Sequence, residues 1–212
     1  MRDWAGWHDA YDDPASALST RLALVQAHLS IALAMAPSGP IRLVSLCAGQ
    51  GRDVVGVLPG HPRRDDVSAL LVESDRRNAG LARDRTVAAG LTNITVLEAD
   101  AGIAANYADA LPADVLLLCG IFGNVSDEDI RRTANAAAVM CAAGGTVIWT
   151  RHRRPPDLTG EIRSWFRAAG FDEVAFDAPP TATLTGVGVH QLPAAVAAQL
   201  PAGRLFTFRP DR

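Results

Sequence analysis

The sequence of 212 residues contains no lysine, so its 20 basic side chains are all arginines. Together with 23 acidic residues they give a formal net charge of -3. This balance provides no strong positive field for nucleic acid or for an anionic membrane, and we expect neither as a partner. The absence of lysine also excludes a P-loop, because that motif ends in Gly-Lys-Ser or Gly-Lys-Thr.

Cysteine is scarce as well. Cys47, Cys119 and Cys141 lie far apart in apolar stretches. An odd number of widely spaced cysteines predicts reduced, buried thiols, and neither a disulfide framework nor a zinc site. The acidic stretch 127–129 is typical of a helix N-terminus rather than of a magnesium site. We therefore expect no bound metal.

The first residues, MRDWAGWHDAYDDP, lack both the apolar core of a signal peptide and the run of about 20 apolar residues that forms a membrane helix. This favours a cytoplasmic protein. No internal repeat, linker or change of composition marks a second domain. We expect one domain over residues 1–212, with a lid and a helix in 1–40 and a core in 41–212. The oligomeric state is left open.

Short apolar runs alternate with segments of helical spacing. A helix is predicted over 15–36, and β-prone runs follow at 41–46, 69–74, 94–99, 114–120 and 145–151. Continuous apolar strands separated by helices indicate a parallel sheet covered on both faces. An antiparallel edge is predicted for the last runs, which no clear helix separates: 171–178, 186–192 and 204–208. The expected fold is α/β, a three-layer αβα sandwich with a Rossmann-like, mostly parallel sheet and an antiparallel edge strand.

Two helix starts carry capping signals. Ser126 precedes Asp129 by three residues, which resembles a capping box. Thr159 is predicted to cap the helix that Gly170 ends.

A glycine turn, SLCAGQGRD, follows the first predicted strand. Gly49 and Gly51 permit positive φ angles and a close approach of the backbone, and a helix from about Arg52 presents unpaired N–H groups. A dinucleotide fingerprint requires a Gly or Ala at position 54, where this chain has Val. The turn therefore predicts a site for a nucleoside that lacks a diphosphate.

Two acidic residues end the next two strands. Glu73 lies about 20 residues beyond the turn, where a carboxylate can accept hydrogen bonds from both ribose hydroxyls. Asp100, beside Ala101, suits the exocyclic amino group of adenine. Taken singly, the turn fits a tight connection and the acids fit surface residues or helix caps. Their occurrence after three successive strands favours a nucleoside site.

This combination resembles the class I S-adenosylmethionine-dependent methyltransferases over roughly residues 41–178. The resemblance implies S-adenosylmethionine as the cofactor and S-adenosylhomocysteine as the product. It implies that the glycine loop holds the methionine part, that the acid after the second strand binds the ribose, and that the Asp after the third binds adenine. By position, the cofactor residues are Ala48, Gly49, Gln50, Gly51, Glu73, Asp100 and Ala101, with Cys119 and Gly120 flanking the cofactor. Ser45 and Cys47 depart from the family, which often has an acidic residue and a glycine there.

The acceptor is expected near the ends of the fourth and fifth strands. Candidate substrate-binding residues are Tyr11, Phe122, Asn124 and Arg151, and candidate general bases are His152 and His8. Ordinary alternatives stay open: Phe122 in the core, Asn124 as a turn residue, and a solvated basic loop after the fifth strand.

The aromatic segment before the first helix contains Trp4, Trp7 and Tyr11. We interpret it as a lid that covers the site and excludes water, the alternative being a segment that simply packs on the helix. Arg21, further along, either pairs with the cofactor carboxylate or faces solvent.

The expected activity is methyl transfer from S-adenosylmethionine to a hydroxyl or amine of a small molecule, achieved mainly by proximity and alignment. The Asn-Pro-Pro-Tyr type of sequence, used for amino groups on nucleic-acid bases, is missing. The alternatives are another transferase or cyclase that uses S-adenosylmethionine, and a non-catalytic nucleoside-binding module.

Overall fold

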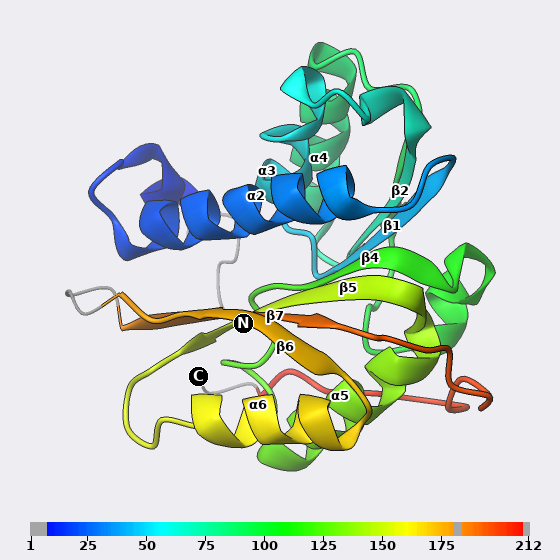
Figure 1. Ribbon diagram of the computed structural model, residues 1–212. Coiled ribbons are helices and arrows are strands. Elements are labelled where there is room, and N and C mark those ends of the chain that lie inside the picture. The colour runs from blue at the N-terminus through cyan, green and yellow to red at the C-terminus, as the bar shows by residue number, and fades with distance from the viewer. Residues whose placement is uncertain (1–7, 180–183, 210–212) are drawn as a thin grey trace.

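A seven-stranded sheet forms the centre of the protein (Figure 1). The computed structural model describes residues 8–179 and 184–209, and side chains from residue 10 onward in the first range. The strands lie in the order β3-β2-β1-β4-β5-β7-β6. They are β1 (Ile41–Leu46), β2 (Val67–Glu73), β3 (Ile94–Glu98), β4 (Ala113–Leu118), β5 (Cys141–His152), β6 (Asp172–Asp177) and β7 (Thr185–Gln191).

Helices connect most of the strands. The α-helices are α2 (Ala17–Met35), α3 (Arg52–Val55), α4 (Arg76–Ala88), α5 (Asp127–Met140) and α6 (Thr159–Ala168). Short 3-10 helices are η1 (His8–Asp12), η2 (Leu58–Gly60), η3 (Arg64–Asp66) and η4 (Ala104–Ala110). The helix predicted after the glycine turn is therefore a single turn, α3.

The sheet is mostly parallel, which confirms the predicted fold class. β1, β2, β3, β4 and β5 pair in parallel, while β7 pairs antiparallel with both β5 and β6. The antiparallel strand thus lies one position inside the edge, and β6 forms the edge itself. Strand order reverses at β1, between β2 and β4, so a crevice is expected beyond the carboxyl ends of these three strands.

Helices cover the two faces of the sheet (Figure 1). α2 and α3 pack on one face, where Leu29, Leu43 and Leu71 belong to one buried cluster. α5 and α6 pack on the other, where Leu116, Trp149 and other side chains form a second. Two buried faces explain why the strands read as continuous apolar runs rather than alternating ones.

One of the two predicted helix caps is confirmed. The Ser126 hydroxyl accepts a hydrogen bond from the backbone N–H of Asp129, at 3.1 Å. The prediction for Thr159 is wrong, because this residue is the first of α6 rather than its cap. The Asp157 carboxylate instead accepts from the Thr159 N–H at 3.0 Å and from its hydroxyl at 2.7 Å.

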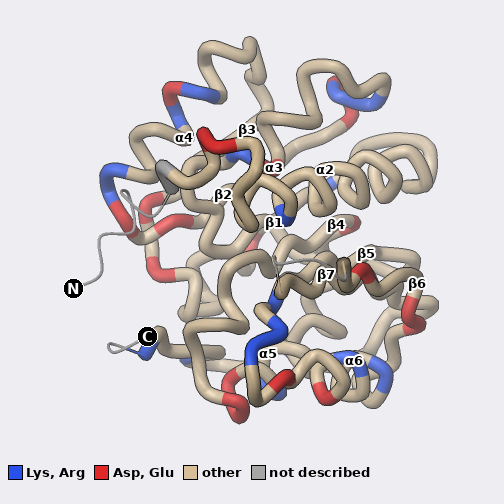
Figure 2. Tube along the Cα trace, turned by 90° about the vertical axis from the view of Figure 1, so that its left-hand side faces the viewer, with Lys and Arg blue, Asp and Glu red and all other residues tan. Residues whose placement is uncertain are grey.

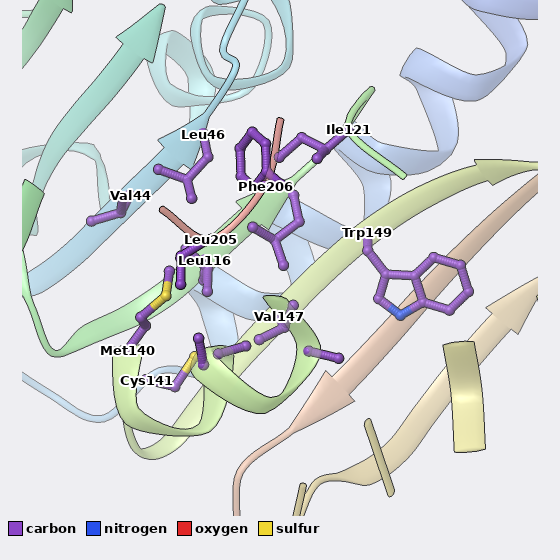
Figure 3. Close-up of a cluster of buried hydrophobic side chains, with 14 of the residues drawn as sticks. Val44, Leu46, Leu116, Ile121, Met140, Cys141, Val147, Trp149, Leu205 and Phe206 are labelled. Atoms are coloured by element: carbon purple, nitrogen blue, oxygen red, sulfur yellow. The ribbon is translucent and has the colours of Figure 1, made fainter. Parts of the chain in front are cut away.

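The last predicted strand, 204–208, is not part of the sheet, and this expectation is wrong. The segment forms one isolated β-bridge, between Ile103 and Arg204, and pairs with no strand of the sheet. The Leu205 N–H instead donates to the carbonyl of Gly102, at 2.7 Å. Leu205 and Phe206 are both buried, next to β1 and β4 side chains of the second cluster (Figure 3). Consecutive burial replaces the alternation of a strand, so the segment fills the core instead of extending the sheet.

By length and composition, α2 is the one described helix that qualifies as a candidate membrane span, with a mean hydropathy of 1.3. A core helix of a water-soluble protein passes the same test. Val25, Leu29 and Leu33 of α2 are buried against the sheet, whereas Ile31 and Met35 are exposed. The absence of a membrane partner, expected from the sequence, stays a prediction.

The C-terminal segment should contribute strongly to stability. Phe206→Ala removes a ring that is 1% exposed, and we expect it to lower the free energy of unfolding by about 3–5 kcal/mol. Val196→Ala, in the same segment but half exposed, should change it by less than about 1 kcal/mol. Urea denaturation measures both, and equal losses in the two variants would contradict this packing.

Candidate functional site

A cavity of about 210 Å³ lies at the carboxyl ends of β1, β2 and β4, beside α2. This is the crevice expected where the strand order reverses. Its lining comes from η1, α2, the loop after β1, α3, the end of β2, α4, the end of β4 and the C-terminal segment. The lining residues are Tyr11, Arg21, Leu22, Val25, Cys47, Ala48, Gly49, Gln50, Arg52, Asp53, Glu73, Ser74, Asn78, Cys119, Gly120 and Phe208.

The glycine loop after β1 bends sharply. Cys47, Gly49 and Gly51 have positive φ angles of 55°, 56° and 67°. The loop is tied to β2 because the Ala48 N–H donates to the carbonyl of Val72, at 3.0 Å. Cys47 adopts this conformation without being a glycine, which is a local strain of the kind found at binding sites.

Gly51 is needed for packing as well as for its φ angle. It is not among the described residues that line the cavity. A Cβ atom there would meet Leu71 at 3.2 Å and Ala82 at 3.6 Å. The lack of a side chain at Gly51 therefore allows the loop to approach β2 and α4. It does not serve to make room for a ligand.

Glu73 lies at the end of β2 and is 8% exposed. One carboxylate oxygen accepts the N–H of Gly49 at 2.8 Å, and the other accepts the N–H of Asp75 at 2.7 Å. Burial raises the pKa of Glu73, while these two hydrogen bonds oppose the shift. A carboxylate offers about four lone-pair sites, so acceptor capacity remains for a donor on a ligand.

A second carboxylate, Asp53 in the first turn of α3, also lines the cavity. It is 8% exposed and accepts a hydrogen bond from the N–H of Val54, at 3.1 Å. Burial raises its pKa, and the positive charge of Arg21 partly offsets that shift. Asp53 carries no distinct signal in the sequence, because an acid in a first helical turn is also an ordinary complement to the helix dipole.

Part of the predicted lid lies over the cavity. Tyr11 lines it, and its hydroxyl accepts a hydrogen bond from Arg21 at 2.5 Å. Next to it, Asp12 pairs with Arg52 at 2.9 Å. These contacts hold η1 against the glycine loop and α2. Trp4 and Trp7 lie outside the described residues, as does the side chain of the predicted base His8.

The predicted adenine acid is engaged by the C-terminal segment. One Asp100 oxygen accepts the N–H of Gly102 at 2.8 Å, and the other lies 2.8 Å from Arg204. Asp100 and Ala101 are not among the described residues lining the cavity, whereas Phe208 is. Sequence reasoning missed Phe208 because it assigned the segment to the sheet, and no local signal marks a chain end that folds back across the site.

The predicted residues after β4 and β5 divide into two groups. Cys119 and Gly120 line the cavity. Phe122 is fully buried and packs against Trp149 and Phe166 with its ring tilted by 45° and 44°, so it is a core residue in this structure. Its carbonyl accepts a hydrogen bond from Arg151.

Of the remaining predicted residues, Asn124 lies in the loop after β4 and His152 lies at the end of β5. The Asn124 amide donates to the carbonyl of Gly120 at 2.8 Å and thereby shapes the turn. His152 ends β5, and a Cβ atom on Gly123 would meet its ring at 3.3 Å. Among the described residues, Asn124, Arg151 and His152 are not part of the cavity lining.

The surroundings of the two cysteines in the cavity wall favour the thiol over the nucleophilic thiolate. Burial raises the pKa of Cys47 and of Cys119, and nearby carboxylates raise both further. The three cysteines are free thiols, as predicted, but of the three only Cys141 is buried, while Cys47 and Cys119 are half-buried. Across the described residues, no group of three or more His, Cys, Asp and Glu side chains has the arrangement of a metal site.

Comparison with known proteins places the fold. No family model matches the sequence, and no curated protein matches it. An O-methyltransferase family protein from Burkholderia thailandensis has a TM-score of 0.68 and 16% identity over 92% of this chain and 60% of that one. Magnesium protoporphyrin IX methyltransferase from Synechocystis, solved with bound SAM, has a TM-score of 0.66 and 12% identity over 87% and 88%. A putative rRNA methylase from Clostridium thermocellum has a TM-score of 0.61 and 9% identity over 85% and 98%.

Identities this low establish the architecture alone. The chain has the fold of the class I S-adenosylmethionine-dependent methyltransferases, with its cavity at the switch point of the sheet. It spans 60% of the length of the Burkholderia protein.

The buried carboxylate of Asp53 generates a prediction for stability. Because its pKa is raised, the folded state holds the proton more tightly, and the free energy of unfolding falls as pH rises through that pKa. Asp53→Asn keeps the shape of the side chain and one acceptor oxygen, but it removes this fall in the free energy of unfolding at higher pH. The variant should be more stable than the wild type near pH 7, and the gain should vanish below about pH 3.

Urea denaturation across this pH range measures the difference between the two proteins. Asp65→Asn, whose parent side chain is 93% exposed, serves as the control and should show no such trend. A gain from Asp53→Asn that stays constant with pH would contradict the assignment.

Proposed function

We propose that this protein transfers a methyl group from S-adenosylmethionine to a hydroxyl or amine of a small molecule. The observation that carries the proposal is the buried Glu73 carboxylate, held beside the glycine loop in a cavity at the switch point of the sheet. The fold is shared with methyltransferases that act on chemically different substrates, so the cofactor, the reaction and the acceptor are inferences about this chain.

The donor and acceptor groups of the cavity fit the proposed cofactor. Glu73 lines the cavity and is assigned to the ribose hydroxyls, for which its carboxylate keeps acceptor capacity. Asp100 and Ala101 are assigned to the adenine, and the loop from Ala48 to Gly51 to the chain that bears the sulfur. When bound, S-adenosylmethionine supplies a methyl group on a positively charged sulfur, which needs no further activation.

The task of the protein is therefore to align an acceptor and to exclude water. Tyr11 and the rest of η1 are assigned to the lid, because the contacts of Tyr11 with Arg21 and of Asp12 with Arg52 hold η1 at the cavity mouth. Removal of a proton from the acceptor is assigned to His152 or His8. Phe122 is a core residue, so Tyr11, Asn124 and Arg151 remain the proposed acceptor-binding residues. Tyr11 has the strongest support of the three, since it lines the cavity.

A small molecule is proposed rather than nucleic acid because of the charge distribution. Acidic and basic residues are interspersed along the chain rather than gathered on one element (Figure 2). The net charge is negative. Structural neighbours include both a porphyrin methyltransferase and a putative rRNA methylase, so the fold does not decide the acceptor. Methylation of RNA or DNA by the purified protein would overturn this part of the proposal.

Isothermal titration calorimetry with S-adenosylhomocysteine tests the cofactor. The wild type should bind it, and Glu73→Ala should weaken binding roughly 10- to 100-fold, the effect of losing a charged hydrogen-bond acceptor. Glu98→Ala is the matched control, since Glu98 stands opposite Glu73 on β3 and is partly exposed. Thermal melting confirms that each variant is folded. No binding by the wild type would refute the cofactor assignment.

The general base is tested by turnover of an acceptor found by screening. If His152 takes the proton, His152→Ala should lower turnover roughly 10²- to 10⁴-fold with little change in cofactor affinity. A loss confined to His8→Ala would assign the base to the lid instead. Unchanged turnover in both variants would mean that alignment alone drives the transfer, and the base would be withdrawn.

A further inference from the structure

Arg52, the first residue of α3, connects two parts of the cavity wall. Its Nε donates a hydrogen bond to the side-chain oxygen of Gln50 in the glycine loop, at 3.1 Å. Its Nη1 donates to the carboxylate of Asp12 at the end of η1, at 2.9 Å. The guanidinium also lies over the ring of Tyr11, 5.4 Å from the ring centroid. One side chain therefore joins the predicted lid to the loop after β1.

The two ends of this connection differ in burial. Gln50 is 4% exposed, and its side-chain oxygen also accepts a hydrogen bond from Arg85 of α4, at 3.3 Å. The backbone of Arg52 is fixed as well, because its carbonyl accepts from the side chain of Gln26 in α2 at 2.8 Å. The side chain of Asp12, in contrast, is 70% exposed. The glycine loop is thus the fixed end of the connection, and η1 is the end that can separate.

Other hydrogen bonds of η1 are local in the sequence. The hydroxyl of Ser16 donates to the carbonyl of Ala10 at 2.6 Å, and the hydroxyl of Ser19 donates to the carbonyl of Tyr11 at 3.0 Å. These bonds shape the turn that leads into α2. Asp12 and Arg52 are 40 positions apart, so their contact sets where η1 lies relative to the glycine loop.

A guanidinium is suited to hold both partners at once. Its N–H groups form a rigid planar fork, so Nε and Nη1 can each donate to a different acceptor. Ion pairs with an exposed partner contribute little to stability and separate readily. Loss of the Asp12 contact therefore frees η1 while Gln50 still holds the guanidinium at the loop.

We propose that Arg52 is a positioning residue that holds η1 closed over the cavity through Asp12 and thereby controls how fast a ligand enters and leaves. The contact between Asp12 and Arg52 is called the latch below. Control of ligand exchange rests on the proposed function, because the ligand used to measure it is S-adenosylhomocysteine. The hold of the latch on η1 is tested without any ligand.

Hydrogen exchange measured by mass spectrometry tests the latch in the ligand-free protein. Asp12→Asn and Arg52→Gln should each speed exchange of the backbone amides of residues 10–16 by roughly 2- to 5-fold, the effect of losing an exposed ion pair. The double variant should exchange no faster than Arg52→Gln alone, because both changes remove the same contact.

Arg83→Gln is the matched control, because it removes another exposed ion pair, with Glu98, between α4 and β3. It should leave exchange of residues 10–16 unchanged, and thermal melting confirms that each variant is folded. Equal exchange in the wild type and both test variants would refute the latch. Effects that multiply in the double variant would refute it too, because the two residues would then act independently.

Stopped-flow measurement of S-adenosylhomocysteine binding tests the control of exchange. Asp12 is not among the described residues that line the cavity, so Asp12→Asn keeps the cavity wall and changes its opening. The association and dissociation rate constants should both rise roughly 2- to 5-fold, while the dissociation constant changes less than about twofold. A rise in the dissociation rate alone, or unchanged rates, would overturn the role in exchange.

The two experiments separate the latch from the proposed function. If the wild type binds S-adenosylhomocysteine but Asp12→Asn changes neither hydrogen exchange nor the rate constants, the cofactor stands and the latch is refuted. If Asp12→Asn speeds hydrogen exchange but the wild type binds no S-adenosylhomocysteine, the hold of Arg52 on η1 is supported, and the proposed cofactor fails together with the control of its exchange.

Discussion

The carboxylate of Glu73 connects two turns on which the whole site depends. It accepts the N–H of Gly49 in the loop after β1 and the N–H of Asp75 just before α4. These turns leave the carboxyl ends of adjacent parallel strands, so one buried side chain sets the distance between them. Charge-assisted hydrogen bonds of this kind are among the stronger ones in proteins, and the low exposure of Glu73 strengthens them further.

The bent loop follows from this constraint. With the Gly49 N–H directed to Glu73, the chain reverses through three positive φ angles within five residues, Cys47 to Gly51. Gly51 then lies against Leu71 and Ala82, where a side chain has no room. The backbone is thereby held close to β2 and α4, while Ala48, Gly49 and Gln50 of the same loop line the cavity.

Sequence reasoning predicted the sheet well because each strand carries its own signal. Apolar runs such as 41–46 and 114–120 indicate strands that are buried on both faces. The acids Glu73 and Asp100 were predicted from their positions at the ends of the second and third strands. The residues that contacts between distant segments bring to the cavity carry no comparable signal. Tyr11 was assigned through the lid, but Asp53 and Phe208 were missed, since a helical acid and a β-prone tail each have an ordinary interpretation.

The C-terminal segment illustrates the limit most clearly. The run 204–208 is β-prone, but each edge of a strand needs a partner with a matching register, and propensity does not show whether one is accessible. Here Leu205 and Phe206 gain more by filling the space beside β1 and β4. The packing of Leu205 and Phe206 places Arg204 next to Asp100 and Phe208 in the cavity wall. Packing of the core therefore determines part of the wall around the site.

The cavity wall contains two buried carboxylates, Glu73 and Asp53, and the guanidinium of Arg21. Such an arrangement lowers the stability of the empty protein, because burial disfavours the charged forms of Glu73 and Asp53. A ligand that donates hydrogen bonds to these carboxylates offsets that cost when it binds, and a ligand of the same shape without such donors does not. Selectivity and local instability are therefore two consequences of the same buried charges, and a variant that stabilises the empty fold at Asp53 should do so at the expense of binding.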